Sequence, residues 1–209
     1  MGKIRSLAFV FAAVMSSNQL AHAAEAKQLS VRHTIQINAP VEKVWEVVSD
    51  FGGLHKWLIF IKDTKITLGE NRKQGAIRLL TRGNGTKIEE RLVEYDPYNM
   101  SASYVYVQGV PLSSDYYSTM SVKDLGNGSS EVEWKATFKR VHYWLETPPE
   151  GKDDASLVKI YNKVYTVGLE AMKTKIESGE LLAHNDGAVP YWRRIKTMTH
   201  TLNVHNRTI

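Results

Sequence analysis

Two residues of opposite charge have the types and the spacing best suited to chemistry in this chain. Glu90 lies in the alternating stretch Lys87–Tyr95, and Arg78 lies in the preceding stretch Gly75–Arg82. Because alternate side chains of a β-strand point to the same side, the more apolar side of each stretch directs one charged residue toward the interior. The two inward sets are Ala76, Arg78 and Leu80, and Ile88, Glu90 and Leu92.

A carboxylate in such a setting needs a partner. Burying an unpaired charge is costly, so Arg78 is the natural counter-ion of Glu90. In a cavity the carboxylate would act as an acid or base, and the arginine or a tyrosine would stabilise an oxyanion. The same two residues would equally form a structural ion pair or an exposed pair at a rim, and the sequence leaves these alternatives open.

Aromatic residues with polar tips occur on the stretches that follow. Tyr104 and Tyr106 share one side of Met100–Val107. We expect Tyr117 and Trp134 to join them on the same face. Rings of this kind suit an amphipathic, largely apolar ligand. The alternative is that they only fill the core.

The common catalytic motifs are absent from the sequence. It contains no Gly-x-Ser-x-Gly, no phosphate-binding glycine loop after a strand and no His-Glu-x-x-His. It has no cysteine, and its seven histidines are scattered, whereas a zinc site needs three or four converging ligands. Asp153-Asp154 is typical of a helix N-terminus. We therefore predict no catalytic residue, no metal site and no cofactor.

The elements that must position these residues follow from hydrophobic periodicity. Alternation predicts a first strand at Val31–Ile37, and apolar residues at helical spacing from Val41 to Val48 predict a short helix that carries Trp45. Short stretches separated by glycine-rich turns then predict an antiparallel meander instead of βαβ units. These stretches are Ile61–Leu68, Gly75–Arg82, Lys87–Tyr95, Met100–Val107, Asp115–Lys123 and Glu131–Arg140.

One long amphipathic helix closes the pattern at Asp153–Ser178, with Gly179 suited to its C-terminal cap. The sequence therefore predicts an α+β fold, in which one curved antiparallel sheet of about seven strands wraps round a single long helix and encloses a cavity. The predicted inner face of the helix carries Leu157, Ile160, Tyr161, Val164, Gly168, Met172 and Ile176.

The N-terminus has the layout of a cleavable secretory signal. Lys3 and Arg5 precede the apolar run Leu7–Met15, and Ala21-His22-Ala23 follows. The alternative, a membrane anchor, would need about 20 apolar residues. We expect cleavage after Ala23, and we expect a periplasmic or secreted protein, because an exported chain without cysteine fits a bacterial periplasm.

The basic character of the chain belongs to its ends. The formal net charge is +5, but the leader and the tail Ala183–Ile209 carry the excess, and residues 24–182 are neutral by formal count. The middle of the chain therefore offers no net attraction for nucleic acid. The tail is expected to be flexible, or to dock through Tyr191-Trp192-Arg193-Arg194 on the domain, a membrane or a partner. We divide the chain into a signal peptide (1–23), one domain (24–182) and a tail (183–209).

Five short motifs occur in order along the domain. They are Pro40-x4-Trp45, Ser49-Asp50-Phe51-Gly52-Gly53-Leu54-x2-Trp57, Gly75-x2-Arg78, Glu90-Arg91-Leu92-x2-Tyr95-Asp96 and Val132-x-Trp134-x3-Phe138. Over roughly Val31–Gly179 this series resembles the polyketide cyclase/dehydrase-type branch of the START-like (SRPBCC, Bet v 1-like) superfamily. The resemblance implies a helix-grip fold with a hydrophobic cavity and no fixed catalytic set.

Plant abscisic-acid receptors are similar relatives, and they extend the set of expected ligand contacts. Glu90 matches a pocket glutamate, whereas Leu58 replaces the lysine that meets the hormone's carboxylate. The gate and latch sequences are not reproduced at Arg82–Thr86 and Gly109–Leu112, so the resemblance does not imply hormone binding. The ligand-binding residues that we predict are Leu58, Arg78, Leu80, Glu90, Leu92, Tyr104, Tyr106, Tyr117, Trp134, Ile160, Val164 and Gly168.

Three functions are compatible with these features. The one we predict is a non-enzymatic periplasmic protein that binds an apolar or amphipathic small molecule, such as a lipid or a polyketide. A second is an accessory protein that assists a periplasmic redox enzyme such as methanol dehydrogenase, since a leader plus this domain resembles the periplasmic accessory proteins of bacterial methanol oxidation. A third is a cyclase or dehydratase that uses Glu90. We expect no nucleic-acid partner and no stable membrane span.

Overall fold

The structure, a computed structural model, describes residues 27–109, 111–141 and 144–181. The expected leader and the expected tail lie outside the described residues. The elements in chain order are β1 (Leu29–Ile37), α1 (Val41–Val48), the 3-10 helix η1 (Phe51–Lys56), β2 (Ile61–Leu68), β3 (Ile77–Arg82), β4 (Lys87–Asp96), β5 (Ser101–Gly109), β6 (Ser114–Gly126), β7 (Ser129–Lys139) and α2 (Asp154–Glu177).

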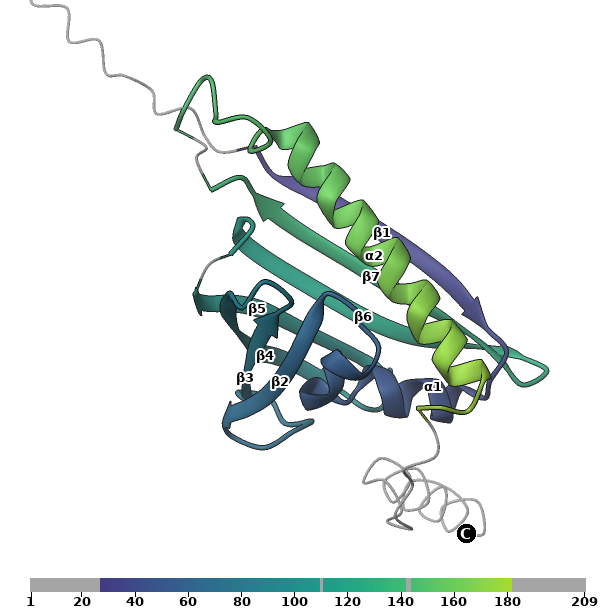
Figure 1. Ribbon diagram of the computed structural model, residues 1–209. Helices are drawn as coiled ribbons and strands as arrows, with labels where there is room; N and C mark the ends of the chain where they lie inside the picture. Colours follow the sequence, from purple (N-terminus) through teal and green to yellow (C-terminus); the bar gives the residue numbers. More distant parts are fainter. Residues whose placement is uncertain (1–26, 110, 142–143, 182–209) are drawn as a thin grey trace, which may run out of the picture.

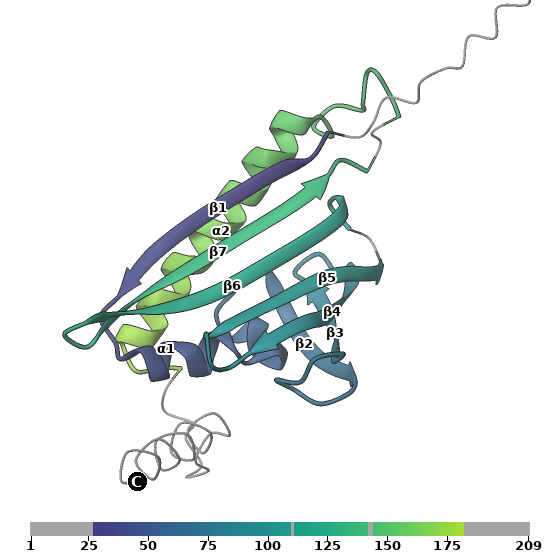
Figure 2. The same cartoon turned by 180° about the vertical axis from the view of Figure 1, so that it is seen from behind.

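The described strands form one antiparallel sheet. Its seven strands lie in the order β1-β7-β6-β5-β4-β3-β2, so only β1 is displaced from its place in the sequence. α2 lies along β1 and β7, and the sheet curves from these strands through β6, β5 and β4 to β2 at its other edge (Figure 1). Viewed from behind, the long strands β1, β7 and β6 lie in front of α2 (Figure 2). The predicted α+β fold, a curved sheet of seven strands and one long helix, is confirmed.

Strand β7 shows why the sheet has a distinct inner face. Its residues alternate between buried and less buried side chains along the whole strand. The inner set consists of Ser130, Val132, Trp134, Ala136 and Phe138, each no more than 3 % exposed. This alternation places one row of side chains against α2 and leaves the other row on the outer face.

Helix α2 begins at the acidic pair Asp153-Asp154, as the sequence predicts, and Asp153 is its N-cap. The Asp153 carboxylate accepts hydrogen bonds from Ser156 N (2.9 Å) and Ser156 Oγ (2.6 Å), which satisfies a free backbone donor of the first turn. The buried face is rotated from the predicted one. Its members are Leu157, Tyr161, Tyr165, Gly168, Leu169, Met172 and Ile176. Ile160 is 37 % exposed and Val164 is partly buried, so these two flank the face instead of forming its centre.

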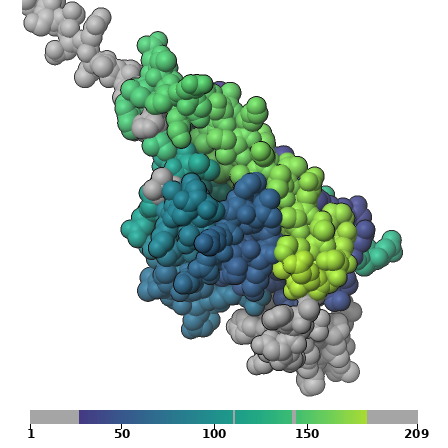
Figure 3. All heavy atoms as spheres, in the orientation of Figure 1, coloured from purple at the N-terminus to yellow at the C-terminus, as the bar shows by residue number. Residues whose placement is uncertain are grey.

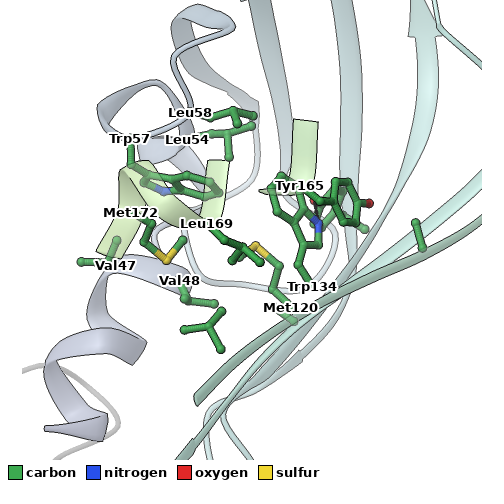
Figure 4. Packing of buried hydrophobic residues seen from close by; sticks show 14 of the residues in the cluster. Val47, Val48, Leu54, Trp57, Leu58, Met120, Trp134, Tyr165, Leu169 and Met172 are labelled. Carbon is green, nitrogen blue, oxygen red and sulfur yellow. Dashed lines mark hydrogen bonds between the residues drawn. The ribbon is translucent and has the colours of Figure 1, made fainter. Parts of the chain in front are cut away.

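The opposite side of the interior is closed by α1 and η1. Leu54, Trp57 and Leu58 project from η1 and the turn after it toward Trp134 and Tyr165, which Figure 4 shows as sticks. The edge of the Trp57 ring meets Trp134 with ring centroids 5.6 Å apart. The segment from η1 to Leu58 therefore forms a wall of large apolar side chains that packs against both the sheet and α2.

One glycine permits a close approach of two strands. At Gly109 the backbone φ is 108°, and a Cβ atom there would lie 2.3 Å from the carbonyl oxygen of Lys87. Only glycine therefore fits the place where the end of β5 meets β4. Within the described part of the chain, no helix is both long enough and apolar enough to cross a membrane.

Candidate ligand-binding cavity

A cavity of about 370 Å³ lies between the inner face of the sheet, η1 and α2. In the space-filling view, atoms of the β2 and η1 region lie directly against the C-terminal half of α2 (Figure 3). The cavity is lined by Leu54, Leu58, Phe60, Ile61, Leu80, Arg82, Asn84, Ile88, Glu90, Tyr104, Tyr106, Leu112, Tyr116, Trp134, Ile160, Tyr161, Lys163, Val164 and Tyr165. All but four of these residues are apolar or aromatic, and the surface therefore favours an apolar ligand.

Glu90 and Arg78 form a buried ion pair at this cavity. They are paired residues in the β3–β4 ladder, and their side chains are 5 % and 4 % exposed. Arg78 Nε donates to Glu90 Oε2 at 2.8 Å, and Arg78 Nη2 approaches the same oxygen at 2.5 Å without the alignment of a hydrogen bond. Among the described residues Glu90 Oε1 has no hydrogen-bond partner, and Glu90 lines the cavity. One carboxylate oxygen is thus committed to Arg78 and the other is not.

Arg78 is fixed from several sides. Its Nη1 donates to the carbonyl oxygen of Phe51 at 3.0 Å. Its guanidinium lies over the rings of Phe51 and Tyr104, with 4.1 Å and 4.7 Å from Cζ to the ring centroids. Burial raises the pKa of Glu90, and the charge and hydrogen bond of Arg78 only partly oppose this. The carboxyl group therefore takes up a proton more readily than an exposed glutamate does.

Two groups of hydroxyls cross-link α2 to the sheet. In the first, Tyr165 Oη lies 2.7 Å from Tyr116 Oη and 3.2 Å from Ser118 Oγ. Trp134 Nε1 completes this group by donating to Ser118 Oγ and to Tyr104 Oη, both at 3.0 Å. The polar tips of these lining residues are therefore satisfied by one another.

In the second group, Tyr161 Oη lies 2.8 Å from Ser113 Oγ and 3.1 Å from Tyr106 Oη. Burial raises the pKa of Tyr161 to about 12, and burial also raises the pKa of Tyr106 well above its ordinary value. The phenols of the cavity consequently remain protonated near neutral pH and act as neutral hydrogen-bonding groups.

The aromatic rings of the wall stack on one another. Trp134 and Tyr165, which Figure 4 shows next to each other, have ring centroids 3.9 Å apart and 11° between their planes. Tyr106 and Tyr116 stack with centroids 4.2 Å apart. These contacts come from α2, β5, β6 and β7, and they hold the wall in one arrangement with flat apolar faces.

The structure places eight of the twelve predicted ligand-binding residues on the cavity wall. They are Leu58, Leu80, Glu90, Tyr104, Tyr106, Trp134, Ile160 and Val164. The other four lie elsewhere. Arg78 is buried behind Glu90, and Leu92 is buried in the core next to Tyr104 on the neighbouring strand.

Tyr117 was placed on the wrong face. The inner register of β6 runs through Tyr116, Ser118, Met120 and Val122, so Tyr116 lines the cavity. Tyr117 is 37 % exposed on the outer face. Two adjacent tyrosines give no difference in hydrophobicity, and the pairing with β5 and β7 decides between them.

Gly168 has a packing role. A Cβ atom at this position would lie 2.7 Å from Leu58 Cδ1 and 3.1 Å from the Trp134 ring. The missing side chain therefore lets α2 approach the wall, although Gly168 itself does not line the cavity.

Several lining residues were not predicted from the sequence. Tyr161 and Tyr165, one helical turn apart, were detectable as part of an apolar stripe. Leu54, Phe60, Ile61, Ile88, Tyr116 and Leu112 are the other apolar ones. Arg82, Asn84 and Lys163 complete the polar part of the lining, and no periodicity indicates them, because they come from the last residue of β3, the turn after it and the exposed side of α2.

Comparison with known proteins places this fold and cavity in a family. The family model described as "Polyketide cyclase / dehydrase and lipid transport" matches residues 28–177. The chain belongs to this family. The match covers β1 through α2, and thus every residue that lines the cavity.

Individual relatives agree with this assignment. MLP-like protein 423 of Arabidopsis thaliana is 29 % identical over 134 residues, which are 58 % of this chain and 83 % of that protein. The solved structure of the protein XoxI from Bacillus cereus is 26 % identical, with a TM-score of 0.59, and the match covers 69 % of this chain and 93 % of that one. Zhui aromatase/cyclase from Streptomyces sp. R1128 is 20 % identical, with a TM-score of 0.61 over 78 % of this chain and all of that chain (100 %), and it shows the fold alone.

At the level of the family, the fold and the cavity are those of proteins that bind hydrophobic ligands or cyclise polyketides. Among the described residues, no group of three or more histidine, aspartate or glutamate side chains is arranged to hold a metal ion.

Proposed function

We propose that this protein is a binding protein for an apolar or amphipathic small molecule, held between α2 and the inner face of the sheet. The observation that carries the proposal is the cavity of about 370 Å³, whose wall is apolar or aromatic at all but four residues. Ligand sites of small molecules in proteins commonly measure about 300–1,000 Å³.

The hydrogen bonds of the wall favour binding over chemistry. Tyr104, Tyr116 and Tyr165 direct their hydroxyls to one another, to Ser118 or to Trp134. The deep part of the cavity therefore presents ring faces and few unused polar groups. A ligand gains from burying apolar area there, at roughly 25 cal/mol per Å².

Titration with N-phenyl-1-naphthylamine, a neutral apolar dye that fluoresces in dry surroundings, tests the proposal. We expect saturable binding to the wild-type chain and loss of most of it in Val164→Trp, which fills the cavity. Val107→Trp is the matched control, because Val107 is 41 % exposed and does not line the cavity. Equal dye binding by all three folded proteins would contradict the proposal.

We further propose that the protein acts outside the cytoplasm. The support is the leader pattern of Lys3, Arg5 and the apolar run Leu7–Met15. Fractionation of the source cells followed by N-terminal sequencing should find a chain that begins at Ala24 in the periplasm or medium. A cytoplasmic chain that retains Leu7–Met15 would contradict it.

A cyclase or dehydratase is the second candidate, and Glu90 is the observation that favours it. Glu90 Oε1 has no partner among the described residues, and burial raises the pKa of the carboxyl group. Such a group is suited to removing a proton next to a carbonyl and returning it to a departing hydroxyl, with Arg78 as its fixed neighbour. Turnover of a linear poly-β-ketone thioester by the wild type but not by Glu90→Gln would support this candidate, and no turnover by either would remove it.

A further inference from the structure

The charged residues that line the cavity include more cations than anions. Besides Glu90, the polar lining consists of Arg82, Asn84 and Lys163. Glu90 forms an ion pair with the guanidinium of Arg78. The other two charged residues of the lining, Arg82 and Lys163, are both cations. The lining therefore carries two cationic side chains and one carboxylate, and the carboxylate is already paired with Arg78.

We propose that Arg82, Asn84 and Lys163 of this lining bind the anionic head group, such as a carboxylate or sulfonate, of an amphipathic ligand whose apolar part fills the interior. This inference rests on the proposed binding function and names the chemical class of the ligand.

Arg82 provides the inner cation. It is the last residue of β3, is partly buried and lines the cavity. Its positive charge acts to lower the pKa values of Glu90 and Tyr161, two other residues of the same lining. An anion bound beside Arg82 would therefore be partly shielded from water.

Lys163 provides the outer cation from a different element. It lies on α2 between Ile160 and Val164, two further lining residues, and its side chain is exposed. Among the described residues it takes part in no ion pair. The ammonium group is thus available to an anion at the edge of the cavity.

The neighbouring polar groups are donors too. Asn84 Oδ1 already accepts from Thr86 N at 3.1 Å and from Thr86 Oγ1 at 2.7 Å, so the group that it can offer to a ligand is its Nδ2 amide. A set of donors with two cations fits an anion or a strong acceptor and repels a cationic head group. The stacked rings deeper in the cavity fit the apolar remainder.

A pair of matched probes separates the head-group site from the apolar cavity. 8-Anilino-1-naphthalenesulfonate and N-phenyl-1-naphthylamine share one ring system and differ by the sulfonate. Both are titrated into the full chain, the wild type being compared with Lys163→Gln and Arg82→Gln. Lys123→Gln is the control, because Lys123 is exposed on β6, does not line the cavity and removes the same charge.

We expect the sulfonate dye to bind the wild type more tightly than the neutral dye. Its affinity should fall about two- to fivefold in Lys163→Gln, in line with an exposed charge contact, and further in Arg82→Gln. Raising the salt concentration should weaken the sulfonate dye alone. The neutral dye should bind all variants equally, and Lys123→Gln should match the wild type with both dyes.

Four results would overturn the inference. If Lys163→Gln left the affinity for the sulfonate dye unchanged, or if it lowered the affinity for both dyes equally, the proposed head-group site would be wrong. The proposed binding of apolar ligands in the cavity would not be affected by these two results. If Lys123→Gln weakened the sulfonate dye as much as Lys163→Gln, overall charge would explain the effect. If neither dye bound the folded chain, the proposed function itself would fail.

Discussion

At the scale of single residues, the buried pair of Arg78 and Glu90 determines the electrostatics of the interior. Arg78 contacts one oxygen of Glu90, the carbonyl of Phe51 and two aromatic rings, and these contacts hold its guanidinium in one orientation. Burying two charges costs several kcal/mol, which such contacts only partly offset. Glu90 responds with a raised pKa, so the pair is sensitive to pH.

The first prediction concerns Glu90→Gln. Because the folded chain raises the pKa of Glu90 above its ordinary value of 4.5, the group's contribution to stability is fully present below that value. The contribution is lost as the pH rises through the folded pKa. Glutamine does not titrate, so the variant does not lose this contribution. The unfolding free energy of Glu90→Gln should therefore increase relative to that of the wild type as the pH rises from acidic to neutral. Urea unfolding over a pH series measures this, and a difference independent of pH would contradict it.

The second prediction concerns Arg78→Met, which leaves the carboxylate without its counter-ion. We expect a loss of about 3–5 kcal/mol in unfolding free energy at neutral pH. The loss should shrink at acidic pH, where a protonated Glu90 needs no counter-ion. Arg32→Met is the control, because the Arg32 side chain is 70 % exposed in its pair with Glu133, and exposed pairs contribute about 0–1 kcal/mol. Equal losses in the two variants would contradict the buried role of Arg78.

Single residues were predictable where hydrophobic alternation was strong. Arg78 and Glu90 each have apolar residues two positions away on both sides, and both are buried as the alternation indicates. Tyr117 was misplaced because its neighbour Tyr116 is chemically identical. Long-range pairing decides that register, and a local pattern contains no information on it.

At the scale of elements, α2 is held to the sheet by its two tyrosines. Tyr161 and Tyr165 lie one turn apart and send their hydroxyls to Ser113, Tyr106, Tyr116 and Ser118. The sequence predicted the helix to within a residue at each end, from Asp153 to Ser178. Its rotation was less certain, since Ile160, Tyr161, Val164 and Tyr165 form one broad stripe. Tyr161 and Tyr165 face inward because their rings and hydroxyls contact aromatic and hydroxyl groups of the sheet.

The third prediction is that Tyr165→Phe destabilises the fold. The change removes a hydroxyl that serves both Tyr116 and Ser118 and leaves buried polar groups with one partner fewer. We expect a loss of about 1–3 kcal/mol in unfolding free energy. Tyr98→Phe, at a tyrosine that is 71 % exposed, should change nothing measurable. An unchanged stability in Tyr165→Phe would show that the hydroxyl does not hold the helix.

The fourth prediction concerns Gly168 on the same helix. In Gly168→Ala the new methyl group meets the flexible end of Leu58 at 2.7 Å, a cost that the higher helix propensity of alanine, about 1 kcal/mol, offsets. Gly168→Leu has no such space and should lose about 1–3 kcal/mol or more through overpacking. Thermal unfolding of the two variants measures the difference. Equal stability would indicate that α2 does not pack closely on Leu58 and Trp134.

At the scale of the whole molecule, the order of the elements was the most predictable property. One strand, a short helix, six strands and a long helix leave little choice but a single curved sheet around α2, and the structure has this architecture. The positions of the charged residues around the cavity were harder to predict from the sequence. Arg82 and Lys163 lie far apart in the sequence, on β3 and α2, and only the folded chain reveals that both line the same cavity.

The two ends of the chain are predicted to act in export and in contact with a partner. The leader 1–23 and the basic tail 183–209 lie outside the described residues. Their roles in export and in contact with a partner stay predictions.

Native mass spectrometry of the full chain, purified from its own source without detergent, tests the central claim most directly. The account predicts a discrete added mass on the wild type, from an apolar or amphipathic molecule that organic extraction releases, and predicts its absence from Val164→Trp. A wild-type protein with no added mass, even after incubation with extracted lipids, or an adduct retained by Val164→Trp, would contradict the account.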